Sequence, residues 1–302
     1  MTVLILGGQQ DPQAVRVREE LCAAGGSVMH YDTTAFPESE LLSLEGDELR
    51  LGRKIVPVTQ SVYVRGLACH PLSPRFHEDL HDRPRGLIAQ CDENRALLES
   101  VLLAFEGRGV RVVNPVGVNE QHSRKPYQLG LLQSAGLPVP RWLATNDPQA
   151  VRTFVRRVGR TVYKPLSGGA SVHEITAEDL SDERLEALSL APVLFQKLVR
   201  GVSVRAYVVG RRVVGAAEIC SPELDYRRNE ESVVPTTLRA EERDAVVAAA
   251  RACSMPFTGV DLIRGRSGFS VLECNPSPMF AVFEQKTGLN IAKPLADFLL
   301  RR

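Results

Sequence analysis

Residues 259–280, GVDLIRGRSGFSVLECNPSPMF, are the segment that most restricts how this chain can fold. Two apolar runs flank a glycine-containing turn, a pattern that predicts a β-hairpin. A turn centred near Ser267 places Asp261 directly opposite Glu273, and the alternation of side chains along a strand puts Asn275 on the same face. Two facing carboxylates repel each other, so we expect a positive group between them.

The three polar residues of this hairpin face offer oxygen donors, which predicts a magnesium site. Mg²⁺ takes one or two carboxylates and completes its octahedron with water and substrate phosphates. We therefore interpret the hairpin as one half of a nucleoside-triphosphate site. The rest of the chain is expected to supply the other half.

Length and composition narrow the class of protein. With 302 residues and 44% hydrophobic content, more than one domain is expected. The net charge of +1 gives no overall field that favours nucleic acid or membrane. The six cysteines form no CxxC pair, which predicts reduced thiols in a cytoplasmic protein. No apolar run reaches the length of a membrane span, and MTVLILGG is typical of a buried strand rather than of a signal peptide.

The pattern of the first third predicts a parallel sheet with crossover helices. Short strands after the βαβ opening are expected to continue this sheet, and a domain boundary is expected near Pro115. The predicted strands are 2–7, 27–32, 48–58, 61–67 and 110–115, and the predicted helices are 12–24 and 92–106.

The remainder predicts a mixed α/β arrangement with an antiparallel C-terminal portion. A hairpin at 204–219 turns at Gly210-Arg211, which fits a two-residue loop. The predicted strands are 161–166 and 193–199, and the predicted helices are 124–135, 147–157, 240–254 and a closing helix at 284–301 that packs Leu289, Ile291, Leu295 and Leu299 inward.

Several cationic residues could complete the phosphate site. Lys164 ends a strand and precedes a glycine-rich loop whose backbone N–H groups can approach phosphates, formed by Ser167, Gly168, Gly169, Ala170 and Ser171. Arg205 opens a strand, and Arg227 has Asn229 two positions on. Each alone fits a solvated surface charge. Together with the hairpin, they match the charge that a triphosphate presents.

Two other motifs were weighed. His77 to His81 match HExxH, but this segment is mostly polar and precedes no obvious third zinc ligand, so a chance match is preferred. The opening strand and helix with Asp32 at the end of the second strand are typical of a dinucleotide-binding unit. The GxGxxG spacing is absent, so we interpret this part as a Rossmann-like scaffold without a cofactor.

From about Asn114 to its C-terminus, the chain resembles ATP-grasp enzymes of the RimK-like branch. The segments SRKPYQLGLLQSAGLPVP, TVYKPLSGG, LFQKLV, VRAYVVG and DYRRN carry the resemblance together with the hairpin. It implies Mg²⁺ ligation by Asp261, Glu273 and Asn275, with two ions that Mn²⁺ can replace. It implies ATP binding by Lys125, Lys164, Ser167, Gly168, Gly169, Arg205 and the adenine linker Gln196, Lys197, Leu198 and Val199. Catalytic roles fall to Arg205, Arg227 and Asn229.

The resemblance also implies a fold and an activity. The expected domains are a Rossmann-like pre-ATP-grasp domain at 1–114, a central subdomain with a glycine-rich lid at 115–190 and a C-terminal subdomain with the metal site at 191–302, with the nucleotide between two sheets. A substrate carboxylate is activated as an acylphosphate and joined to an amine or a hydroxyl, releasing ADP and phosphate. Lys197 and Ser203 stand where relatives often have acidic residues.

The substrate is the least defined part of this expectation. PRWLATNDPQAV and FEQKTGLNIAKPLADFL look most similar to graspetide-type peptide ligases, which implies a carboxylate-bearing, acidic peptide or protein as partner. A small amino-acid or glutamate ligase stays open, as does a nucleotide-binding regulatory protein without turnover. Relatives are often dimers, so a homodimer is compatible with the resemblance. Neither nucleic acid nor membrane is an expected partner.

Overall fold

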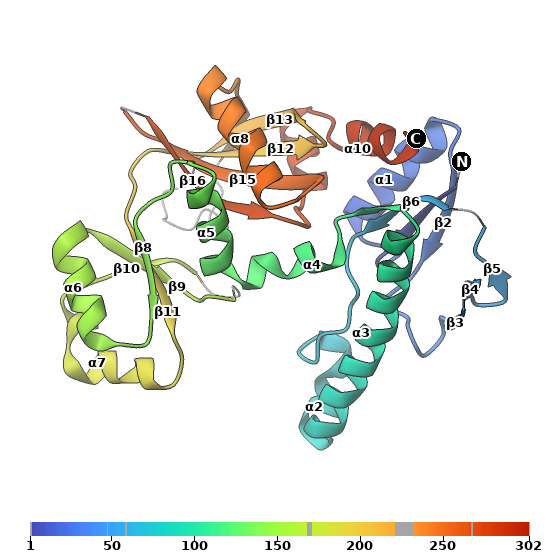
Figure 1. The fold of residues 1–302 in the computed structure, drawn as a ribbon, viewed down its shortest axis with the longest axis horizontal. Helices are drawn as coiled ribbons and strands as arrows, with labels where there is room; N and C mark the ends of the chain where they lie inside the picture. The colour runs from blue at the N-terminus through green and yellow to red at the C-terminus, as the bar shows by residue number, and fades with distance from the viewer. Residues whose placement is uncertain are drawn as a thin grey trace. The chain divides into compact units, whose positions relative to one another are not determined.

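The computed structural model describes residues 2–46, 48–57, 59–167, 171–220, 232–266 and 268–301 (Figure 1). Its contacts divide the chain into two compact units. The first unit comprises Met1–Val116, Met279–Val282 and Asn290–Arg302, and the second comprises Gly117–Pro278 and Phe283–Leu289. We describe each unit by itself.

The first unit is built on a four-stranded parallel sheet in the order β2-β1-β6-β7, as predicted from the βαβ opening. Apolar residues of α3 pack on the sheet in one core, and α1 lies against α10. Ser61 of β6 donates a hydrogen bond to the carbonyl of Leu299 in α10. The elements are β1 (Thr2–Leu6), α1 (Pro12–Ala23), β2 (Ser27–Tyr31), β6 (Thr59–Val64), α3 (Pro84–Gly107), β7 (Arg111–Val113) and α10 (Ala292–Leu300).

A small antiparallel sheet corrects one prediction. Residues 48–58 were expected to extend the parallel sheet, but their strands pair with each other and with β3 instead. The reason is loop length: a few residues can join antiparallel strands, whereas parallel neighbours need a long crossover. The strands are β3 (Leu42–Glu45), β4 (Glu48–Leu51) and β5 (Lys54–Ile55).

The helix expected at 92–106 begins earlier than predicted. Pro84 occupies the first turn of α3, a position where a proline costs no hydrogen bond. Leu87 and Cys91 are buried against Phe76, which explains why the helix extends back over a polar stretch. The preceding elements are η1 (Pro74–Phe76) and α2 (His77–Asp82).

In the second unit, a four-stranded antiparallel sheet has the order β10-β9-β11-β8. Helices α6 and α7 pack on one of its faces through a core that includes Val151, Phe154 and Phe195 (Figure 1). Strand β8 was not predicted. The elements are β8 (Trp142–Thr145), α6 (Pro148–Val158), β9 (Thr161–Lys164), β10 (His173–Glu174), η3 (Glu178–Leu180), α7 (Asp182–Glu186), η4 (Ala187–Ser189) and β11 (Val193–Lys197).

The second sheet of this unit is antiparallel and has the order β14-β13-β12-β15-β16. Helix α8 covers one face with buried Ala245, Val246 and Ala249 (Figure 1). The strands are β12 (Val202–Val209), β13 (Arg212–Cys220), β14 (Ser232–Pro235), β15 (Phe257–Arg264) and β16 (Phe269–Asn275). The helices are α4 (Val116–Asn119), η2 (Glu120–Ser123), α5 (Lys125–Ser134) and α8 (Ala240–Ala252).

The single closing helix expected at 284–301 is wrong, because two helices occupy this segment: α9 (Ala281–Thr287) and α10. Gly288 follows α9 with a φ of 70°, the left-handed conformation that commonly ends a helix. Of the four residues expected to point inward, Ile291, Leu295 and Leu299 are fully buried, whereas Leu289 is only partly buried.

No helix among the described residues combines the length and the apolar character needed to cross a membrane.

Candidate active site

The hairpin of β15 and β16 has the predicted pairing at its functional end. Asp261 lies opposite Glu273, and Gly259 lies opposite Asn275. Nearer the turn, Leu262 pairs with Val271, so Leu272 is the extra residue of a β-bulge. Without this bulge, the register would place Leu272 opposite Asp261. The bulge therefore creates the facing carboxylates.

These carboxylates lie on the face of the sheet away from α8. Val260, Leu262 and Cys274, which alternate with them along the two strands, are buried in the core against α8. The Asp261 side chain is 10% exposed and that of Glu273 is 24% exposed. Charged groups with so little contact with water need compensating partners.

Arg205 provides the partner of Asp261. The two residues are paired across β12 and β15. Arg205 Nε donates to Asp261 Oδ1 at 2.7 Å and Nη2 donates to Oδ2 at 2.6 Å. Such a two-pronged contact is the strongest form of ion pair between these side chains. The row Arg205–Asp261–Glu273 thus runs across three neighbouring strands.

Two lysines from other elements approach Glu273. Lys125 Nζ, at the start of α5, lies 4.0 Å from Glu273 Oε2. Lys164 Nζ, at the end of β9, lies 3.9 Å from the same oxygen. Lys125 also donates to the carbonyl of His122 at 2.8 Å. Among the described residues, Lys125, Lys164 and Arg205 bring three positive charges to these two carboxylates, an arrangement that favours an anionic ligand.

The edge strand β16 is held in place by α5. Gln128 Nε2 donates to the carbonyl of Cys274 at 2.8 Å, and its Oε1 accepts the Cys274 N–H at 2.9 Å. The Val271 N–H donates to the carbonyl of Pro138 at 2.8 Å. The Gln128 side-chain amide therefore makes the two backbone hydrogen bonds that a neighbouring strand would make at Cys274, the residue between Glu273 and Asn275. Gln128 was not predicted from the sequence, although its place three residues after Lys125 on one helix face is a usable signal.

The thiol of Cys274 lies behind the carboxylates. A hydrogen bond with Cys253 and complete burial both raise the pKa of Cys274 well above its usual value. It is therefore a neutral thiol at physiological pH and has none of the character of a nucleophile.

The face of the smaller sheet that carries Lys164 also carries Gln196. Lys164 pairs with Leu194, and Gln196 follows two positions later. Gln196 is 3% exposed, and its buried Nε2 has no hydrogen-bond partner within the described residues. A buried amide donor in this state is suited to a ligand with an acceptor.

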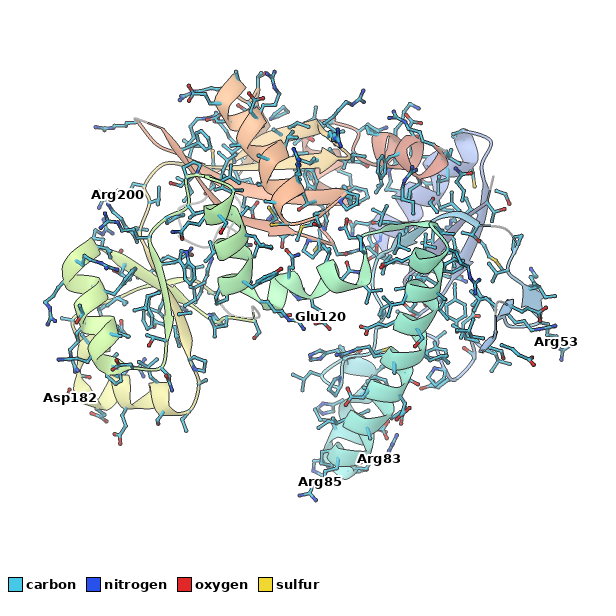
Figure 2. The ribbon with its side chains drawn as sticks, viewed as in Figure 1. Arg53, Arg83, Arg85, Glu120, Asp182 and Arg200 are labelled. Carbon is cyan, nitrogen blue, oxygen red and sulfur yellow. The ribbon has the colours of Figure 1, made fainter. Side chains whose placement is uncertain are left out.

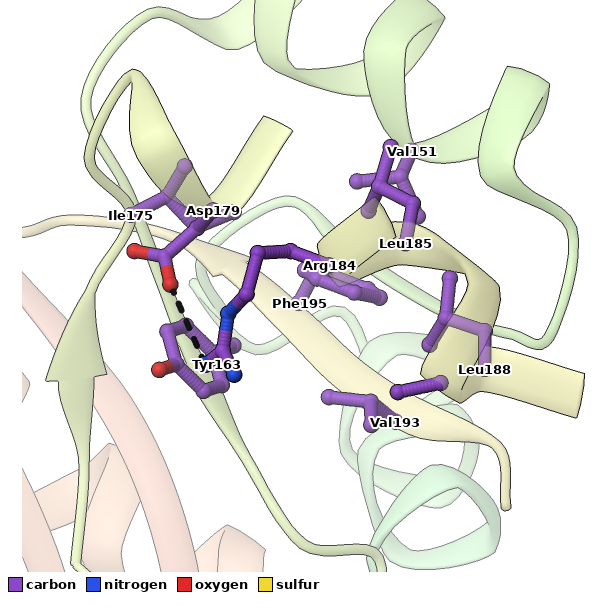
Figure 3. Close-up of a pocket in the computed structure, with 10 residues that line it drawn as sticks. Val151, Tyr163, Ile175, Asp179, Arg184, Leu185, Leu188, Val193 and Phe195 are labelled. Atoms are coloured by element: carbon purple, nitrogen blue, oxygen red, sulfur yellow. Dashed lines mark ion pairs between the residues drawn. The ribbon is translucent and has the colours of Figure 1, made fainter. Parts of the chain in front are cut away.

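The opposite face of this sheet borders a separate cavity of about 160 Å³. Tyr163, Val193 and Phe195 line it, and the ion pair of Arg184 with Asp179 lies at one end (Figure 3). Strand alternation directs Lys164 and Gln196 away from it. None of the predicted ligand-binding residues that the structure describes lines this cavity.

The other predicted site residues have less definite surroundings. Ser167 and Lys197 are exposed, whereas Leu198 and Val199 are partly buried. The backbone N–H of Lys197 donates to the carbonyl oxygen of Arg141, and that of Leu198 donates to the carbonyl oxygen of Arg160. The predictions for Gly168, Gly169, Arg227 and Asn229 lie outside the described residues.

The two rejected motifs occupy the first unit. His77 and His81 lie on the six-residue helix α2, where the His81 ring is 88% exposed and contacts Asp82. Asp32 accepts hydrogen bonds from the hydroxyl and the N–H of Thr34. Within the described ranges, no group of three His, Cys, Asp or Glu residues could hold a metal. The hairpin set differs because its third donor is an amide.

Comparisons with known proteins identify the family of the chain. A model of the RimK-like ATP-grasp domain matches residues 123–299. A probable alpha-L-glutamate ligase 2 of Shewanella amazonensis is 32% identical over 213 residues, covering 66% of this chain and 70% of that protein. A probable alpha-L-glutamate ligase of Haemophilus influenzae is 30% identical over 211 residues, with the same coverage of 66% and 70%.

Solved structures extend the likeness over almost the whole chain. The ATP-grasp ligase PsnB, complexed with a phosphomimetic variant of a minimal precursor, Mg and ADP, has a TM-score of 0.91 and 37% identity, covering 99% of this chain and 97% of its own. The macrocyclase MdnC of Microcystis aeruginosa, bound with its precursor peptide MdnA, has a TM-score of 0.79 and 22% identity, with 99% of both chains covered. The second likeness shows the fold alone.

Proposed function

This chain belongs to the RimK-like ATP-grasp family and is an ADP-forming carboxylate–amine ligase, and we propose that it ligates carboxylates of a peptide or protein. The observation that carries the proposal is the convergence of Lys125, Lys164 and Arg205 on the carboxylates of Glu273 and Asp261. The peptide as substrate is supported by the 37% identity to PsnB, which was solved with its precursor.

The residues present fit ATP and Mg²⁺. Asp261, Glu273 and Asn275 are oxygen donors of the kind that Mg²⁺ prefers. Each carboxylate oxygen has two lone pairs, so Asp261 can bind a cation while it accepts from Arg205. Mg²⁺ held by these residues would neutralise the charge of the phosphates. We propose two ions at this face, with Mn²⁺ as a substitute.

We assign the nucleotide contacts by charge and burial. Lys125 and Lys164 lie near enough to Glu273 to turn from its carboxylate to phosphate oxygens. The adenine lies along Gln196 to Val199. The N–H groups of Lys197 and Leu198 already donate hydrogen bonds to backbone carbonyls, so we propose that the base is recognised through carbonyl groups and through Gln196 Nε2, which has no partner among the described residues.

The reaction proceeds in two transfers. A substrate carboxylate oxygen attacks the γ-phosphorus in line, ADP leaves and an acylphosphate forms. An amine, or a hydroxyl, then attacks the acyl carbon, loses a proton and displaces phosphate. Positioning and charge stabilisation supply the catalysis, so no protein nucleophile is required.

Four residues outside the described ranges, together with Ser167 beside them, complete the proposal. Arg227 and Asn229 stabilise the transferring phosphoryl group. Ser167, Gly168 and Gly169 belong to a lid that excludes water, which would otherwise hydrolyse the acylphosphate.

ADP release measured against a panel of acceptors tests this function. The panel contains an acidic peptide, the same peptide with glutamines in place of its carboxylates, and free glutamate with a protein tail. We expect ADP release only with the acidic peptide, together with the loss of one water per bond by mass spectrometry.

Turnover only with free glutamate would contradict the peptide assignment. That outcome would instead support a small-molecule ligase, which the 32% identity to a probable glutamate ligase favours as the second candidate. Nucleotide binding without turnover on any acceptor would contradict both and identify a regulatory protein.

A further inference from the structure

A basic hollow of about 460 Å³ lies beside α8, away from the carboxylate cluster. Its charged residues are Arg211 and Arg212 at the β12–β13 turn, and Arg243, Asp244 and Arg251 on α8. These five residues are exposed. Since α8 covers one face of the five-stranded sheet and Asp261 lies on the other, the hollow and the nucleotide residues are separate.

The charge of this hollow is strongly unbalanced. Four arginines and one aspartate give a formal charge of +3, whereas the whole chain carries only +1. Arg243 lies 3.7 Å from Asp244. In the part of the chain that the structure describes, the side chains of Arg211, Arg212 and Arg251 form no ion pair and no hydrogen bond.

Some exposed arginines outside this cluster form ion pairs. Arg83 pairs with Asp79, and Arg160 forms two bonds with Glu174. Like charges held close together repel, so an uncompensated arginine cluster lowers stability unless an anion binds it. The hollow therefore has the character of a binding surface.

The hollow also has an apolar part. Val213, Val247 and Ala248 contribute partly buried side chains. Arg243, Val247 and Arg251 are spaced by four residues, which places them along one stripe of the helix. The two arginines are therefore separated by about 12 Å along the axis, with the valine between them.

We propose that the basic hollow binds an extended acidic segment of a partner protein, with the pattern acidic–x–aliphatic–x–acidic. In an extended chain, residues i, i+2 and i+4 share a face and span about 13 Å. Two carboxylates of this segment pair with Arg243 and Arg251, and the aliphatic side chain between them contacts Val247. The planar guanidinium groups suit carboxylates.

A nucleic acid is a poorer fit. Single strands bind by stacking their bases on aromatic side chains, and no aromatic residue lines the hollow. A simple polyphosphate would leave the apolar residues without a contact.

Fluorescence anisotropy with a labelled peptide tests the proposal directly. The probe has Glu-Gly-Leu-Gly-Glu at its centre and is titrated with the full chain at low ionic strength. The test variant is Arg243→Gln/Arg251→Gln. The matched control is Arg53→Gln/Arg85→Gln, which removes the same charge from two exposed arginines of the first unit (Figure 2).

We expect the test variant to weaken probe binding at least tenfold and the control variant to change it less than twofold. A probe with glutamines in place of the glutamates does not bind, and one with serine in place of leucine binds several-fold more weakly. Acceptor-dependent ADP release stays at the wild-type level in the test variant, which separates this surface from the proposed reaction.

Three results would overturn the proposal. Wild-type chain that fails to bind the probe has no such surface. If both double variants weaken probe binding equally, the binding depends on the overall charge of the protein and not on this surface. Binding of an oligonucleotide or tripolyphosphate that is tighter than the peptide, and lost in Arg243→Gln/Arg251→Gln, assigns the hollow to another class of ligand.

Discussion

At the scale of single residues, Glu273 is the point where the site is assembled. Lys125 and Lys164 come from different elements, and each nitrogen lies within 4.0 Å of the same Glu273 oxygen. Asp261 is instead paired with Arg205 on the neighbouring strand. The two carboxylates therefore have different partners. An anionic ligand could therefore attract Lys125 and Lys164 away from Glu273.

Replacing either lysine should weaken ATP use. Charge-assisted hydrogen bonds contribute about 1.5–3 kcal/mol, so Lys125→Met and Lys164→Met should each lower kcat/KM for ATP by roughly 10–100-fold. Steady-state kinetics over a range of ATP concentrations provide the measurement. Lys54→Met, at an exposed position of β5, is the matched control. Values within twofold of wild type for both active-site variants would remove the lysines from the phosphate site.

The positions of individual site residues could be predicted from the sequence where the strand register of a local hairpin determined which residues face each other. The hairpin pattern identified Asp261 and Glu273 as facing residues, and the structure confirms the pair. The partner of Arg205 was not predicted, because the pairing of β12 with β15 joins segments far apart in the chain. Gln128 was missed for the same reason, since its two bonds connect α5 with β16.

At the scale of elements, the edge strand β16 depends on a helix for its outer hydrogen bonds. Gln128 is buried and occupies both the N–H and the C=O of Cys274. Glu273 and Asn275 flank this residue, so the helix that begins with Lys125 also orients the oxygen donors.

Gln128→Ala should therefore affect both stability and metal use. It leaves two buried backbone groups unpaired, which costs about 3 kcal/mol. We also expect a higher Mg²⁺ concentration for half-maximal ADP release. Urea denaturation and a Mg²⁺ titration provide the measurements. Ser134→Ala, at an exposed position of the same helix, should change stability by less than about 0.5 kcal/mol. A Gln128→Ala variant with wild-type stability and Mg²⁺ dependence would contradict the role of this clamp.

A buried ion pair between Glu242 and Arg264 connects the start of α8 to β15. Arg264 Nε donates to Glu242 Oε1 at 2.8 Å, and Glu242 Oε2 accepts the Arg239 N–H at 2.9 Å. The hydrogen bonds from Arg264 lower the pKa of Glu242, against the opposing effect of its burial.

This lowered pKa predicts a pH dependence of stability. A carboxyl whose pKa is lower in the folded chain stabilises it fully above its unfolded pKa of about 4.3, and that stabilisation disappears as the pH falls through the folded pKa. Glu242→Gln should therefore cost about 2 kcal/mol at pH 7, with a difference from wild type that closes below about pH 4. Urea denaturation across pH measures it, with exposed Glu241→Gln as control. A difference that grows at low pH would contradict this pairing.

Element boundaries were predicted best where local signals define them. Pro148 and the cap Asp147 begin α6, and Gly136 follows α5 with a φ of 74°. The same signal at Gly288 was overlooked, and two helices were merged. Strand β8 could not be recognised, because its four residues gain their hydrogen bonds from β11, about fifty positions later.

At the scale of the whole molecule, the α/β class of the fold could be predicted from the sequence. The two compact units could not be read from the order of residues along the chain, because each contains segments that are separate in sequence. The parallel sheet of the first unit and the antiparallel sheet of the second were both expected. Residues 290–302 belong to the first unit although they end the chain. The association of this segment with the first unit depends on contacts between residues far apart in sequence, for example the hydrogen bond from Ser61 to Leu299. A local sequence pattern does not predict such contacts.

The measurement that tests the central account most directly is Mg²⁺-dependent ADP release by Asp261→Asn and Glu273→Gln, with a folded state confirmed by circular dichroism. Both changes keep the side-chain shape but remove the charge that we propose holds the cation and that pairs with the three basic residues. We predict the loss of ADP release in both variants and wild-type turnover in Glu45→Gln, at an exposed position of the first unit. ADP release that survives in both site variants would contradict the assignment of this hairpin as the metal and nucleotide site.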